Sequence, residues 1–101
     1  MNFFADRLEH HFIQLAVRKA GVTDEALKKF AVLVWPDKEE KRAHEKIKLL
    51  TEGYPKKGGV RQRLVFGDAQ RMALALQIPL GYLVTLAEEN VKREEQGLEP
   101  Y

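Results

Sequence analysis

Two neighbouring runs of cations are the side chains in this sequence whose types and spacing point most clearly to chemistry. The first run lies in residues 37–51, and the second lies in residues 53–67, which contain no acid. The cations that we expect to face outward are Lys38, Lys41, Arg42 and Lys48 in the first run, and Lys56, Lys57, Arg61 and Arg63 in the second. Clustered ammonium and guanidinium groups bind phosphate, and the release of counterions from a nucleic acid supplies much of the affinity. We therefore expect these side chains to contact double-stranded DNA.

Acids in the first run leave a second interpretation open. Asp37, Glu39, Glu40 and Glu45 bring its net charge close to zero. Glu and Lys at such spacing also form pairs four residues apart on an ordinary solvated helix. The second run has its own alternative, an exposed loop that is basic for solubility. Because the second run directly follows the first, we favour a shared surface that binds phosphate.

Two capped helices position the first run. Thr23 is the expected N-cap of a helix over residues 24–34, and Asp37 is the expected N-cap of a helix over residues 37–51. The break at Trp35-Pro36 is too short to hold another element. Helices joined by so tight a turn cross at a large angle, so the earlier helix can brace a later one that projects from the surface.

The helix over residues 37–51 has an aliphatic stripe opposite its cations. Ala43, Ile47 and Leu50 recur at helical spacing on this stripe. A helix that packs through so narrow a stripe leaves most of its circumference exposed. Such a helix can lie in the major groove of DNA, where its cations reach base edges or phosphates.

Periodicity in the rest of the chain predicts a compact all-α fold of five helices in a single domain, residues 1–101. The other three helices are expected from residue 2 or 4 to 19, from Asp68 as N-cap to about 77, and from Pro79 into the acidic C-terminal segment. Residues 54–66 are expected to form a loop or a short hairpin around the Gly58-Gly59 turn, and residues 96–101 to form a frayed end.

Composition restricts the class of function. A chain of 101 residues, 45% hydrophobic and 32% charged, is ordinary for one soluble domain. It has no apolar run near the roughly 20 residues of a membrane span and no signal-peptide pattern, so we expect no membrane association and a cytoplasmic location. There is no cysteine and no His-Glu-x-x-His motif, and adjacent His10 and His11 would point about 100° apart on a helix. We expect no enzyme activity, no metal and no cofactor.

Three strings carry a resemblance to a known family: FIQLAVRKAGVTDEAL, LLTEG and DAQRMALALQIPLGYLV. The first looks like the first helix, the Arg-x-x-Gly link and the start of the second helix in the lambda-repressor-like helix-turn-helix family, the Cro and xenobiotic-response-element group of bacterial and phage regulators. The second is similar to the end of that family's recognition helix, and the third to its fourth and fifth helices. The resemblance covers about residues 10–86. It implies a sequence-specific regulator that binds DNA as a dimer, with residues 37–51 as the recognition helix.

Residues 69–87 fit the helix-turn-helix spacing a second time. In that register the outward side chains of residues 80–88 would be apolar and acidic, which suits protein contact better than phosphate. We therefore assign DNA contact to the earlier helix. Tyr82, Val84 and Val91 are candidates for a homodimer interface.

The leading hypothesis is a DNA-binding transcription regulator of bacterial or phage type that acts as a homodimer. The alternative is a protein-binding module, of the antitoxin or adaptor kind, that uses the same scaffold without touching DNA. A helical fold by itself does not decide between the two.

Overall fold

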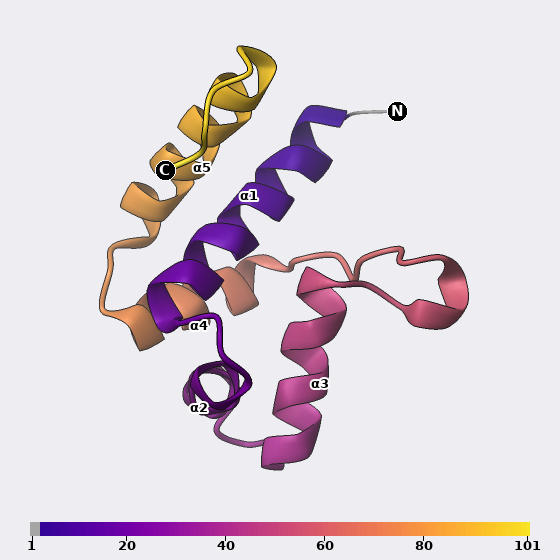
Figure 1. Cartoon of the computed structure of the whole chain (residues 1–101). Helices are drawn as coiled ribbons and strands as arrows, with labels where there is room; N and C mark the ends of the chain where they lie inside the picture. The colour runs from indigo at the N-terminus through magenta and orange to yellow at the C-terminus, as the bar shows by residue number, and fades with distance from the viewer. Residues whose placement is uncertain (1–2) are drawn as a thin grey trace.

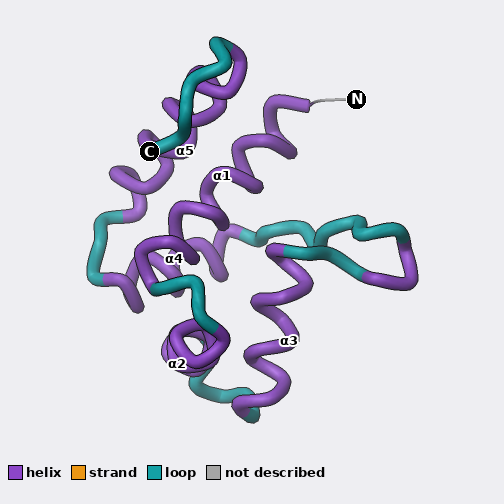
Figure 2. Tube along the Cα trace, viewed as in Figure 1, coloured by secondary structure: helices purple, strands orange, loops and turns teal. Residues whose placement is uncertain are grey.

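The two longest helices, α1 (Phe3–Ala20) and α5 (Leu80–Glu95), lie side by side and run in opposite directions (Figure 1). The computed structural model describes residues 3–101, so the expected helix start at residue 2 lies outside it. Three further helices pack near one end of this pair: α2 (Asp24–Val34), α3 (Glu40–Thr51) and α4 (Phe66–Leu76). Figure 2 shows helices and loops but no strand in this part of the chain. The predicted all-α fold of five helices is confirmed.

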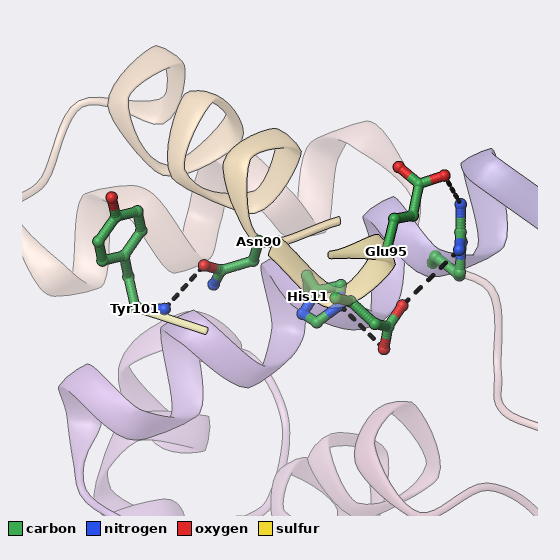
Figure 3. A network of polar contacts seen from close by, with 6 residues as sticks. His11, Asn90, Glu95 and Tyr101 are labelled. Atoms are coloured by element: carbon green, nitrogen blue, oxygen red, sulfur yellow. Dashed lines mark hydrogen bonds and ion pairs between the residues drawn. The ribbon is translucent and has the colours of Figure 1, made fainter. Parts of the chain in front are cut away.

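Polar pairs join the first half of α1 to the C-terminal end of α5 (Figure 3). Arg7 Nη2 donates to Glu95 Oε2 at 3.2 Å, and the buried His11 has its Nε2 atom 3.4 Å from Glu94 Oε2. Phe12 of α1 belongs to the same hydrophobic core as the inner residues of α5. No helix in the described chain is long and apolar enough to cross a bilayer.

The last residues fold back along α5, so the expectation of a frayed end is wrong. The backbone N–H of Tyr101 donates to Asn90 Oδ1 at 2.7 Å (Figure 3). Arg18 of α1 donates to the backbone oxygen of Tyr101 at 2.7 Å. The Arg93 guanidinium lies 4.4 Å from the centre of the Tyr101 ring. Chain ends are ordered when side chains satisfy their backbone groups, and Asn90 and Arg18 do so here.

Helices α2 and α3 cross at a large angle, since Figure 1 shows α2 end-on and α3 from the side. Thr23 Oγ1 accepts a hydrogen bond from the N–H of Ala26 at 3.2 Å, which confirms the predicted N-cap of α2. The predicted stripe of α3, Ala43, Ile47 and Leu50, is fully buried.

The link between α2 and α3 corrects the second predicted cap. Helix α3 begins at Glu40, three residues after Asp37, and no side chain caps its first turn. A turn occupies the preceding residues, because the N–H of Lys38 donates to the carbonyl of Trp35 at 3.1 Å with Pro36 in the position that proline favours. The Asp37 carboxylate lies instead 3.6 Å from Arg71 Nη1 of α4.

Asp68, predicted to cap the fourth helix, lies within α4 and is buried. The helix begins at Phe66, with Val65 in the cap position and no side-chain cap. Asp68 Oδ1 accepts a hydrogen bond from Trp35 Nε1 at 2.9 Å, and Asp68 Oδ2 lies 3.4 Å from Lys46 Nζ. The same ammonium lies 5.3 Å from the centre of the Trp35 ring. One carboxylate thus joins α4 to the α2–α3 corner and to the middle of α3.

A tight link connects α4 to α5. Gln77 adopts the left-handed conformation, with φ 57°, that most often falls to glycine at a helix end. The N–H of Ile78 donates to the carbonyl of Ala73 at 3.0 Å. Pro79 occupies the N-cap position of α5, one residue before its predicted place inside the helix.

Residues 52–65, which we call the basic arm, project from the end of α3 (Figures 1 and 2). They contain a short 3-10 helix, η1 (Pro55–Lys57), and the arm's only bridge pair, Tyr54 with Val60. The expected hairpin is therefore reduced to one pair closed by Gly58 and Gly59, both at positive φ. At the base, Gly53 has φ 87° and is buried.

Replacing Asp68 by Ala should destabilise the fold by about 1–3 kcal/mol, because it leaves a buried indole N–H and a half-buried ammonium without a partner. Urea denaturation followed by circular dichroism measures this loss. Asp37→Ala is the matched control: its ion pair is exposed, so it should cost less than about 1 kcal/mol. Equal losses in the two variants would contradict a structural role for the buried carboxylate.

Replacing Gly53 by Ala should release the basic arm from its observed path. A Cβ there would lie 2.2 Å from the Gly59 carbonyl oxygen, and φ 87° is strained for any residue with a side chain. We expect a loss of about 1–3 kcal/mol and faster amide exchange in the arm. Gly58→Ala is the control, since its φ of 68° is also positive but nothing lies within 4 Å. It should cost only about 1 kcal/mol.

Candidate nucleic-acid interface

Helix α3 exposes its cations on the sides away from its buried stripe. Lys41, Arg42 and Lys48 are exposed, while the three stripe residues are inaccessible to solvent. Lys38 is also exposed, but it lies in the turn before the helix. The predicted division of this segment into a packed side and a basic side is therefore present.

These four cations are not neutralised by direct ion pairs. Within residues 3–101, none of them has its charged nitrogen within 4.0 Å of a carboxylate. Of the acids among them, Asp37 lies 3.6 Å from Arg71 Nη1 of α4, whereas Glu39, Glu40 and Glu45 are exposed and have no ion-pair partner in that part of the chain. The surface of α3 is thus mixed in sign: Lys41, Arg42 and Lys48 are free to meet a phosphate, whereas Lys46 is held by Asp68.

The basic arm continues from the C-terminal end of α3. Arg61 Nε donates to the carbonyl of Thr51 at 3.0 Å, and the N–H of Gln62 donates to the carbonyl of Leu49 at 3.1 Å. These bonds satisfy carbonyl groups that the last turn of a helix leaves free. They also fasten the base of the arm to the helix that carries the first run of cations.

The tip of the arm carries its two lysines. Lys56 and Lys57 are both exposed in η1, and Lys57 Nζ lies 5.3 Å from the centre of the Tyr54 ring. Neither forms an ion pair with another described residue. The second predicted run thus lies on an arm that is hydrogen-bonded to the end of α3, the helix that carries most of the first run.

Arg63 differs from the other predicted DNA contacts because it is already paired. Its Nη2 atom donates to Glu9 Oε2 at 2.6 Å, and the N–H of Leu64 donates to Glu9 Oε1 at 2.9 Å. Burial raises the pKa of Glu9, but these bonds outweigh it and hold that pKa below its usual range. In the structure, Arg63 attaches the arm to α1 instead of presenting a free cation. No local sequence signal links it to Glu9.

A cavity of about 340 Å³ lies between α1 and the arm. His10 lines it together with Asp6, Ile13 and Arg61. Burial lowers the pKa of His10, and the nearby Arg61 guanidinium lowers it further. The described residues include no group of three or more His, Asp or Glu side chains that could hold a metal ion.

The structure separates the three candidates for a dimer interface. Tyr82 is 55% exposed and Val84 is half-buried, but Val91 is completely buried and cannot meet a second chain, so that assignment is wrong. Phe66, 62% exposed, and Leu74, 77% exposed, were not among the candidates although they form part of the outer face of α4. Leu74 could have been found, because it lies opposite the predicted core side of that helix.

Comparison of the chain with family models, with curated proteins and with solved structures gives no match.

Acidification should destabilise the protein through His10. The unfolded chain takes up a proton near pH 6.5, whereas the folded chain resists it because the pKa of His10 is lowered, so stability is lost as pH falls through that value. The lowered pKa of Glu9 makes stability depend on pH only below its usual pKa of 4.5, outside this range. We expect His10→Gln to flatten the decline in melting temperature between about pH 7.5 and 5.5. An unchanged slope would exclude His10 as its source.

Proposed function

We propose that this protein is a cytoplasmic transcription regulator that binds double-stranded DNA sequence-specifically, with α3 in the major groove and the basic arm along the neighbouring phosphates. One observation carries the proposal: exposed cations without ion-pair partners within the described chain extend along α3 and on into an arm that is bonded to its end. The resemblance to lambda-repressor-like regulators supports the same assignment.

Each cation has a role that follows from its position. Lys38 lies in the turn before α3, and Lys41 and Arg42 lie in its first turn, where a helix in the groove reaches base edges or phosphates. Lys48 at the end of α3, with Lys56 and Lys57 at the tip of the arm, would hold the backbone. Arg61 adds charge at the base of the arm.

The surface of α5 is a poor alternative for DNA contact. Its exposed positions include Tyr82, Glu88 and Glu89, and an acidic surface repels phosphate. Tyr82 and Val84 fit self-association better, and a homodimer would present two copies of α3 to related half-sites.

The protein-binding alternative rests on exposed apolar side chains of α2 and α4. Leu33 is 65% exposed and Leu74 is 77% exposed, and both line one hollow together with Pro36. Exposed apolar patches of this kind mark protein contacts. An adaptor or antitoxin would use this face and leave the cations of α3 solvated.

Replacing Lys56 and Lys57 together by Gln should reduce the slope of log K against log salt by roughly two units, since each lysine would neutralise one phosphate. Replacing Lys41 and Arg42 together should lower the affinity for duplex DNA in the same way. The measurement is fluorescence anisotropy with a labelled duplex over a salt series.

The control replaces Lys19 and Lys92, two exposed lysines at the ends of α1 and α5, and should leave the slope unchanged. An unchanged slope for the Lys56 and Lys57 pair would remove the arm from the interface. A wild-type chain that fails to bind duplex at low salt, where micromolar binding is expected, would favour the protein-binding alternative.

A further inference from the structure

A single carboxylate attaches the basic arm to α1. Glu9 accepts hydrogen bonds from Arg63 Nη2 at 2.6 Å, from Arg63 Nε at 3.1 Å and from the N–H of Leu64 at 2.9 Å. Paired bonds between a guanidinium and a carboxylate are among the stronger side-chain interactions and fix orientation as well as distance. The Glu9 side chain is 23% exposed and that of Arg63 is 72% exposed, so the acid belongs to the body of the domain and the arm reaches to it.

The other attachment of the arm is to α3, through Arg61 and Gln62. The base of the arm is therefore held between α3 on one side and α1 on the other. Beyond the base, the backbone hydrogen bonds of the tip, such as that from the N–H of Tyr54 to the carbonyl of Val60 at 2.8 Å, stay within the arm. The direction in which Lys56 and Lys57 point is thus determined where the arm meets the body.

We propose that Glu9 is a positioning residue for DNA binding, which aims the basic arm through Arg63 and Leu64 without touching DNA itself. The inference rests on the proposed function. It adds to the proposed cationic contacts an acid, Glu9, that affects DNA binding indirectly. It also gives Arg63 a different role from the neighbouring cations, since its guanidinium serves the attachment of the arm.

The sign of the effect separates this role from simple electrostatics. Neutralising an acid near a DNA-binding surface normally tightens binding, and here it would also free the Arg63 guanidinium, so the salt slope would rise by about one unit. A positioning role has the opposite consequence. An arm released from α1 must be ordered again when DNA binds, and that ordering reduces affinity.

The test is a double-mutant cycle on the full chain with Glu9→Gln, Arg63→Gln and the double variant. Affinity for a labelled duplex of random sequence is measured by anisotropy at low salt and over a salt series. Each single variant should bind about 5- to 20-fold more weakly, and the double variant should bind no more weakly than the singles, because all three break the same attachment. The salt slope should not rise in Glu9→Gln.

Asp6→Asn supplies the matched control. Asp6 is an exposed acid on the same helix, about one turn earlier, and it forms no hydrogen bond with the arm in the described structure. This variant should bind as tightly as the wild type or more tightly. Amide exchange gives a second readout: the N–H of Leu64 should exchange faster in Glu9→Gln and at the wild-type rate in Asp6→Asn. If Glu9→Gln folds poorly, Arg63→Gln tests the same attachment from its exposed side.

Two results overturn the inference while leaving the proposed function intact. In the first, the wild type binds duplex and Glu9→Gln binds equally well or better. In the second, the losses in the two single variants add up in the double variant. A wild-type chain that binds no duplex overturns the proposed function and this inference with it.

Discussion

The arrangement of the domain depends on the buried carboxylate of Asp68. Apolar contacts hold α3 only through a narrow stripe, and the hydrophobic effect is non-directional, so this stripe leaves the rotation of the helix poorly determined. The hydrogen bond from Trp35 and the ion pair with Lys46 add direction, because each requires a particular geometry. The same acid belongs to α4. The orientation of the candidate reading helix is therefore set in part by a residue of a different helix, which is bonded to the corner before α3 and to the middle of α3.

Helical periodicity predicts most of this fold, and local capping chemistry predicts less. The buried faces of α1, α3 and α4 follow from apolar spacing, and Thr23 caps α2 as expected. Asp37 and Asp68 have the same local pattern as a cap, yet both side chains interact with distant residues. An aspartate before an apolar run offers its oxygens equally to a nearby N–H or to a tertiary partner. Only the packed structure decides which of them it meets.

The candidate site likewise combines features that the sequence predicts with features that it does not. The exposed cations of α3 could be predicted because exposure follows from the helix wheel. The pairing of Arg63 with Glu9 could not, since the two residues are 54 positions apart and neither belongs to a recognisable motif. Val91 was misassigned for a related reason: the later turns of α5 look polar in sequence, but their inner side is covered by α1 and by the returning chain end. Contacts between distant segments thus account for each of these errors.

The two-sided attachment of the basic arm makes its tip nearly independent of the rest of the domain. Gly58 at the tip has open space around it, and lengthening a loop whose ends are already held costs little additional entropy. Residues between the attachments can therefore be exchanged, inserted or recharged at small cost to the core. Such a segment can diverge quickly under selection while the helices beneath it stay unchanged, so related chains would be expected to differ most in this stretch.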